Sequence, residues 1–291
     1  MTENQIGNNE ILKPKNDIVF QTLFTRGKEK ITKDLLEKIL KIKIHKLELD
    51  KSKDLLNENK SDKNGRVDLR AIINDNIECD IEVQLSTHDK MIPRFLLYWA
   101  KMYSANLKVG DDYNKLRRTI SIIIVDGELP EFKGIRKSQT NWQVREEEYK
   151  SIILTSYLEI CIIELPKAIR EYETNKENGA LQWMMFLNDP EDKEVTKIMD
   201  ENENIKEARE ELDRISQDDL LRRMAFKAEL ERMDRNQMMK EAKRDGISEG
   251  IEKGVEKEKI QIAKNMLKEK ASIEFIIKVT GLTKEEIEKL K

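Results

Sequence analysis

The amino-acid sequence predicts an α/β domain followed by a helical extension. Two runs of alternating polar and apolar residues, 67–73 and 77–85, flank an Asn/Asp cluster, a pattern typical of a β-hairpin. Apolar residues have helical spacing on both sides of this hairpin. From residue 170 onward the chain is highly charged and helical in pattern, which predicts the extension.

Helices are expected before the hairpin, and a helix and two strands after it. Residues 17–26 and 31–42 each place apolar side chains three and four positions apart, as in an amphipathic helix. Residues 50–64 are rich in Lys, Asp and Asn and are expected to form a loop. The elements expected after the hairpin are a helix at 91–108 and buried β-branched strands at 119–125 and 158–164.

A three-residue loop at 74–76 would set the register of the hairpin. With Ile73 opposite Ile77, Asp68 falls directly opposite Glu82. Directly opposed Cβ atoms lie about 5 Å apart, and two carboxylates at that distance repel each other unless a cation lies between them. Such an oxygen-rich acidic cluster suits Mg²⁺ or Mn²⁺ better than zinc.

The two faces of the hairpin differ in polarity. The apolar face is expected to pack inward, which leaves the acidic side chains on a shared polar face with Arg66 and Arg70. The same register places Arg66 opposite Gln84 and Arg70 opposite Asp80. The alternative is an exposed sheet face whose charges serve solubility, and a slip of one residue in register would separate the facing acids.

Basic residues and a tyrosine share one face of the helix that follows the hairpin. A cationic helix beside an acid pair suits phosphodiester chemistry, because cations contact phosphates and a metal ion acts as a Lewis acid. The alternative is an ordinary solvated helix face whose lysine stems cover apolar surface. The residues of this candidate DNA-binding face are Lys90, Arg94, Tyr98, Lys101 and Lys108.

Composition excludes several other classes of protein. The chain has 291 residues and a net charge of -3, so any attraction for nucleic acid must be local. No apolar run approaches the roughly 20 residues that a membrane span needs, and the polar first ten residues lack the apolar core of a secretory signal. Only Cys79 and Cys161 are cysteines, which excludes a disulfide framework and favours a reducing, cytoplasmic setting. Only two histidines occur, too few for a histidine-built metal site.

The second half is expected to contain three parts. We predict a domain at 1–168, a charged helical region at 169–244, a connector at 245–259 and a small helical module at 260–291. Glycine recurs every four residues within 245–259, which fits either a solvated flexible connector or a helix face for close self-association. The last module resembles a helix-turn-helix in outline, although its acidic final helix would repel phosphates. Self-association or partner docking is therefore the expected role of this module, and DNA reading is the alternative.

Short motifs along nearly the whole chain resemble those of PD-(D/E)xK nucleases. The order and spacing of these motifs are more specific than any one of them, and they are similar to the recombination-promoting nuclease (Rpn) and transposase branch of that superfamily. The motifs are NDIVF at 16–20, RVD at 66–68, IEVQ at 81–84, YWAKMY at 98–103, GDDY at 110–113, ELPK at 164–167, the glycine repeat, and EFIIKVTGLTKEEI at 274–287.

The resemblance implies a mixed sheet flanked by helices and Mg²⁺-dependent (or Mn²⁺-dependent) hydrolysis of DNA. It implies that Asp68 and Glu82 bind the metal, with the backbone carbonyl of Val83 as a further ligand. Asp17 would be an additional acid, although its place in a first helical turn also explains it. Gln84 stands where the superfamily usually has lysine.

Glutamine can orient the attacking water but brings no positive charge. We therefore expect Lys101 or Arg70 to supply the charge that the usual lysine provides. The leading hypothesis is a metal-dependent DNA endonuclease acting in transposition or recombination, which self-associates through its C-terminal helices. The alternatives are a DNA-binding or assembly protein that keeps the fold without turnover, and a helical interaction protein.

Overall fold

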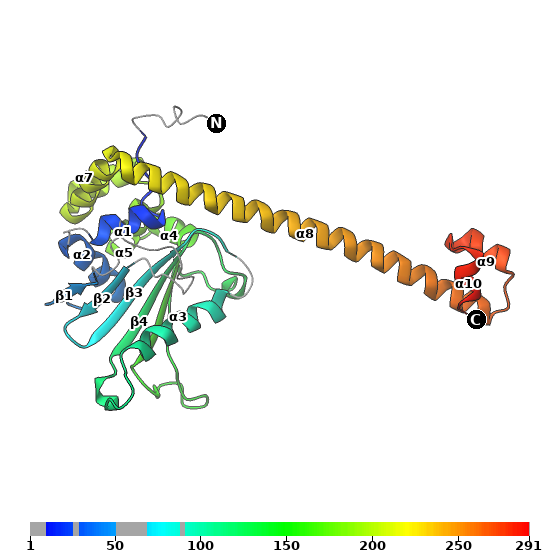
Figure 1. The fold of residues 1–291 in the computed structure, drawn as a ribbon. Helices are drawn as coiled ribbons and strands as arrows, with labels where there is room; N and C mark the ends of the chain where they lie inside the picture. Colours follow the sequence, from blue (N-terminus) through cyan, green and yellow to red (C-terminus); the bar gives the residue numbers. More distant parts are fainter. Residues whose placement is uncertain (1–9, 26–28, 51–68, 88–90, 291) are drawn as a thin grey trace. The chain divides into compact units, whose positions relative to one another are not determined.

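The computed structural model describes residues 10–25, 29–50, 69–87 and 91–290 (Figure 1). The chain divides into two compact units, Met1–Glu229 and Leu230–Lys291. Across the described ranges, every helix is too short or too polar to cross a membrane.

A six-stranded mixed sheet forms the centre of the first unit. Its order is β1-β2-β3-β4-β6-β5, with β3, β4 and β6 parallel and the three remaining pairs antiparallel. The predicted mixed sheet flanked by helices is confirmed. The strands are β1 (Leu47–Leu49), β2 (Leu69–Ile73), β3 (Ile77–Gln84), β4 (Arg118–Val125), β5 (Gln139–Trp142) and β6 (Leu158–Glu164).

The β2–β3 hairpin has the predicted register. Ile73 pairs with Ile77, and Arg70 pairs with Asp80. The turn requires left-handed backbone at Asn74 (φ 50°), whose side chain also accepts hydrogen bonds from two backbone N–H groups of the segment before β1, at 2.8 and 3.2 Å. Asparagine suits this position because its short polar side chain tolerates a positive φ.

One face of the sheet packs against most of the helices, which form the larger core. Alternate residues of β3, including Cys79 and Ile81, point into this core, as the alternation predicted. Trp183 is fully buried there and donates its indole N–H to Asp34 at 2.8 Å. The helices are α1 (Asp17–Thr25), α2 (Glu29–Leu40), α4 (Leu165–Tyr172), α5 (Gly179–Asn188), α6 (Lys193–Glu201) and α7 (Glu203–Gln217).

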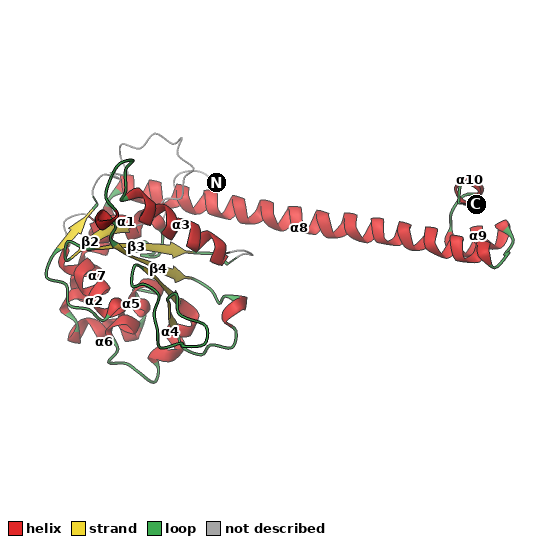
Figure 2. Cartoon of the chain, turned by 90° about the horizontal axis from the view of Figure 1, so that it is seen from below, coloured by secondary structure: helices red, strands yellow, loops and turns green. Residues whose placement is uncertain are grey.

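The other face of the sheet is covered by α3 (Met91–Ala105). Met91 and Phe95 of this helix pack against Ile123 and Ile160 in a second, smaller core. Figure 2 shows the sheet between α3 on one side and α2 and α5 on the other. Because both faces are covered, side chains on either face of the central strands are buried.

The last α-helix to begin in the first unit is α8 (Asp219–Lys268), whose Leu221 and Ala225 join the larger core. The repeated glycines lie farther along α8 in helical conformation, with open space where each side chain would be. Edge strands β1 and β5 were not predicted, because three or four residues are too few to show alternation. Most of the expected loop at 50–64 lies outside the described residues.

The second unit contains α9 (Ile273–Thr280) and α10 (Lys284–Glu288). Ile276 and Ile287 of these helices pack against Ala263 of α8 in a small core of their own. Gly281 ends α9 with a φ of 71°, and the predicted capping box of Thr283 and Glu286 begins α10. Two helices joined by a short turn are therefore present at this end of the chain.

Candidate active site at the carboxyl end of β3

Four polar residues follow one another on the same face of β3. Glu78, Asp80 and Glu82 are buried, with 1%, 1% and 4% of their surface exposed, and Gln84 at the end of the strand is half-buried. The alternative of an exposed sheet face is wrong for these residues, because α3 covers the face on which they lie. Because an unpaired buried charge is costly, each of these buried acids must be paired with a cation or protonated.

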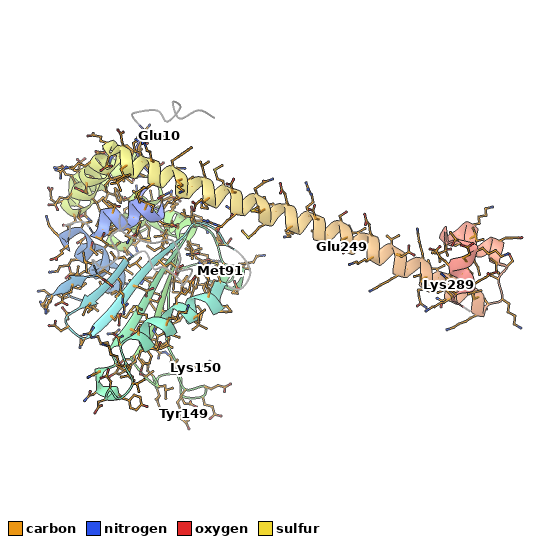
Figure 3. The ribbon with its side chains drawn as sticks, in the orientation of Figure 1. Glu10, Met91, Tyr149, Lys150, Glu249 and Lys289 are labelled. Carbon is orange, nitrogen blue, oxygen red and sulfur yellow. The ribbon has the colours of Figure 1, made fainter. Side chains whose placement is uncertain are left out.

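Glu82, Gln84 and Arg94 form a connected polar group. Arg94 donates to Glu82 Oε1 at 3.1 Å and also to the amide oxygen of Gln84. Gln84 in turn donates its amide N–H to the same oxygen of Glu82. Figure 3 labels Met91 at the start of α3, and Arg94 lies three residues farther along that helix.

Arg94 was predicted on the DNA-binding face, whereas its guanidinium turns toward the end of β3. It lies 5.5 Å from the ring centroid of Tyr98, which helps to hold it in place. Sequence reasoning missed the contact with Gln84. The short connection between β3 and α3 is the signal that could have found it. A helix that begins a few residues after a strand has its first turn near the end of that strand, and Arg94 lies in the first turn of α3.

Burial raises the pKa of Glu82 to about 7. Arg94 opposes this rise in pKa, and the charge of Asp17 adds to it. Asp17 is exposed in the first turn of α1 and lies near enough for its charge to act on Glu82. The structure therefore brings Asp17, Glu82 and Gln84 into one region.

The segment before α1 is tied to the same end of the sheet. Asp126, which directly follows β4, donates its backbone N–H to the carbonyl of Gln84 at 2.7 Å. Its carboxylate forms an ion pair with Lys15 at 2.7 Å. These contacts place the start of α1 beside the carboxyl ends of β3 and β4.

Asp80 is buried, and its carboxyl oxygens lack hydrogen-bond partners among the described residues. Burial raises its pKa to about 8; the nearby Ser121 hydroxyl lowers the pKa, and the charges of Glu82 and Glu78 raise it. Within the described part of the chain, neither carboxyl oxygen has a hydrogen-bond partner of normal geometry. A buried carboxyl with two free oxygens next to Glu82 is a feature that a cation would satisfy.

Neither residue expected to replace the superfamily's lysine contacts Gln84 in this arrangement. Arg70 forms an ion pair with Glu78, which also accepts from Asn106. Lys101 is exposed on α3, and Lys108 is exposed beyond the end of that helix. Among the described residues, Arg94 is the cation that contacts Gln84.

Two predicted site residues, Asp68 and Lys90, lie outside the described residues. The side chain of Val83 packs in the larger core, as expected for a residue that would offer only its backbone carbonyl. Within the described ranges, no three His, Cys, Asp or Glu side chains gather closely enough to hold a metal ion. The donors present are oxygens, which fit Mg²⁺ or Mn²⁺ in kind, but a complete site would need Asp68.

A mixed sheet flanked by helices, with buried acids on the second strand of its hairpin, is the architecture of a nuclease-like domain of the PD-(D/E)xK type. Residues 14–242 match the family described as PD-(D/E)XK nuclease family transposase. The chain belongs to this family, as its motifs predicted. No curated protein and no solved structure matches the chain.

The end of the chain has a match of its own. Residues 256–291 match the Rpn/YhgA-like nuclease family, C-terminal HTH domain. This range contains α9 and α10, which are joined by the turn at Gly281. The resemblance to the recombination-promoting nuclease branch and the helix-turn-helix outline are both confirmed.

Proposed function

We propose that this protein is a divalent-metal-dependent DNA endonuclease that acts in recombination or transposition. The observation that carries the proposal is the buried Glu82 carboxylate, which is joined to Gln84 and Arg94 and influenced by Asp17. This group lies at the carboxyl end of a central strand in a chain of a nuclease family. Reacting groups are commonly found at such sites of perturbed pKa.

Glu82, Asp68 and the carbonyl of Val83 are the proposed ligands of Mg²⁺ or Mn²⁺, with Asp17 as an additional acid. When bound, the ion polarises the scissile phosphate and lowers the pKa of a water molecule. Gln84 orients that water through its amide, which has both a donor and an acceptor. The buried carboxyl of Asp80, whose oxygens lack hydrogen-bond partners in the described ranges, lies next to Glu82 on the same face of β3, and a bound cation would favour its ionised form.

Arg94 supplies the positive charge that Gln84 lacks. A guanidinium binds phosphate oxygens well, because its donors form paired, charge-assisted hydrogen bonds. Arg94 already contacts the amide of Gln84, so its charge stands beside the group that orients water. We therefore assign the role of the superfamily's lysine to Arg94, and no longer to Lys101 or Arg70.

DNA is the proposed partner, and two observations support it. The exposed Lys101 and Lys108 extend the site along and beyond α3, and Lys90 and Tyr98 remain predicted contacts. The helix-turn-helix match adds a second DNA-binding element. Self-association through the C-terminal helices, a cytoplasmic location, and the predicted parts 1–168, 169–244, 245–259 and 260–291 remain proposals.

The test is cleavage of supercoiled plasmid by the purified full chain. Mg²⁺ and Mn²⁺ should each support nicking, while EDTA should abolish it. Nicking that persists in EDTA would contradict a metal-dependent mechanism.

A second candidate is a DNA-binding protein without turnover. It is favoured by one observation: Arg94 already neutralises Glu82, so the acid has a partner without a metal ion. This candidate predicts that the full chain retards plasmid on a gel at every metal concentration and never nicks it.

A further inference from the structure

A cavity of about 670 Å³ lies at the amino edge of the parallel strands. Its walls come from the residues directly before β3, β4 and β6, including Asn76, Arg117 and Tyr157. The candidate active site lies at the other end of β3. Eight residues of extended strand separate the two ends by about 23 Å, so the cavity is distinct from the site at Glu82.

Cations dominate the wall of this cavity. Lys115, Arg117 and Arg118 line it together with a single acid, Asp75. The charge of Asp75 is already offset by Lys46, which lies 2.5 Å away. The cavity therefore has a net positive lining.

The three cations retain capacity to bind a ligand. Arg117 forms no ion pair with a residue in the described part of the chain. Arg118 pairs with Glu159 at 2.5 Å through one terminal nitrogen, but its Nε is buried and has no hydrogen-bond partner there. Lys115 pairs with Asp111 only in an exposed i,i+4 contact, and such contacts contribute about 0–1 kcal/mol.

An aromatic ring and amide groups complete the wall. Tyr157 is 41% exposed, and its ring is held from the side by Tyr103 at 6.3 Å in an edge-on contact. Asn76 and Asn114 add side-chain amides, which can donate and accept hydrogen bonds. Cations beside a fixed aromatic face are the combination that binds nucleotides, because the ring stacks on a base while the cations hold the phosphate.

We propose that this cavity binds the phosphate ester of a nucleotide, with Arg117 and Arg118 on the phosphate and Tyr157 against the base. Two sources share this chemistry: a free nucleotide and a nucleotide within DNA. Binding of a nucleotide within DNA rests on the proposed function, since the cavity would then be a second contact for the DNA strand that is cut at Glu82. Binding of a free nucleotide does not depend on cleavage.

Two binding measurements in EDTA distinguish the sources without any cleavage. Calorimetry measures binding of adenosine monophosphate, and fluorescence anisotropy measures binding of a labelled 20-base-pair duplex. Arg117→Ala should weaken at least one of them about tenfold. Arg117→Lys should recover part of the loss, because it restores the charge without the planar donors. The matched control is Arg214→Ala, which removes an exposed arginine from α7 on the other side of the sheet.

The two binding measurements on the Arg117→Ala variant identify the ligand. Loss of monophosphate binding alone supports a free nucleotide as ligand, and loss of duplex binding alone supports a DNA contact. A Tyr157→Leu change should weaken monophosphate binding and leave binding of inorganic phosphate unchanged. If Arg117→Ala binds both probes like wild type, or if Arg214→Ala is equally impaired, the cavity is not the site. If the chain binds through Arg117 but never cleaves plasmid, only the nuclease proposal fails.

Discussion

Arg94 connects the two residues on which the proposed chemistry depends. Its guanidinium donates to the carboxylate of Glu82 and to the amide of Gln84. The carboxylate is buried, so loss of Arg94 would leave it without its main cationic partner. The same residue would stabilise negative charge on the phosphate during cleavage.

Replacing Arg94 should therefore impair cleavage more than it impairs DNA binding. Arg94→Ala is expected to lower the cleavage rate about 10²-fold, the range typical for loss of one donor to a developing charge. Arg94→Lys should recover part of the rate. Single-turnover plasmid cleavage and gel retardation measure the two effects, with Lys101→Ala on the same helix as the comparison. A larger loss in the Lys101 variant than in the Arg94 variant would reverse the assignment.

Asp80 should make stability depend on pH. The pKa is about 8 in the folded chain against an ordinary 3.8. Between these values the folded state holds a proton that the unfolded chain has lost, so stability falls as pH rises, by as much as about 1.4 kcal/mol per pH unit. The destabilisation is absent below about pH 4 and complete above about pH 8.

Asp80→Asn replaces the titrating carboxyl with a neutral amide, so the variant should unfold at a higher temperature than wild type at pH 8. The difference in melting temperature should shrink toward pH 5. Thermal unfolding in EDTA over this pH range measures it. An equal difference at both pH values would show that Asp80 does not titrate in this window.

At the residue scale, the sequence predicted which residues gather but not how they pair. The alternation of β3 placed Glu78, Asp80 and Glu82 on one face, and the register of the hairpin was also correct. The burial of these acids depends on α3 lying over them, which no local pattern encodes. The direction of Arg94 depends on the same packing.

At the scale of elements, the β2–β3 turn holds the register on which the site depends. A slip of one residue would move every side chain of β3 to the opposite face. Asn74 has φ 50° and its side chain bonds to the segment before β1 at three backbone groups. The turn therefore fixes the hairpin and the edge strand together.

Asn74→Ala should lower the free energy of unfolding by about 2 kcal/mol, through the left-handed backbone and the lost hydrogen bonds. Urea unfolding measures the change. The control is Asp75→Gly, which removes a side chain from the neighbouring residue at φ 65° and should be nearly neutral. Equal effects of the two changes would mean that the side-chain contacts of Asn74 contribute nothing.

Longer elements were predicted well and short ones were not. Periodicity predicted α1, α2, α3, β4 and β6, because each has enough residues to show its repeat. β1 and β5 depend instead on pairing with a neighbouring strand. Such pairing is a tertiary effect that outweighs the weak local preference of three or four residues.

At the scale of the whole molecule, the two family matches cover different parts of the chain. The nuclease family match spans 14–242, and the helix-turn-helix match spans 256–291. The second unit also has a core of its own, formed by residues such as Ile276 and Ile287. We therefore expect cleavage and part of the DNA affinity to be separable.

Deleting residues 245–291 should leave plasmid cleavage intact and weaken duplex binding about tenfold, which corresponds to about 1.4 kcal/mol. The larger core is complete without this segment, because its last members are Leu221 and Ala225. Anisotropy and plasmid cleavage measure the two properties. Loss of cleavage in a truncated chain that still melts cooperatively would assign the activity to the assembled full-length protein.

The most direct test of the account is cleavage of supercoiled plasmid in Mn²⁺ by wild type beside Glu82→Gln. The control is Glu191→Gln, which removes an exposed acid before α6. We predict nicking by wild type and by the control, and none above the EDTA background by the Glu82 variant. Equal nicking by Glu82→Gln and wild type would contradict the assignment of the active site to the end of β3.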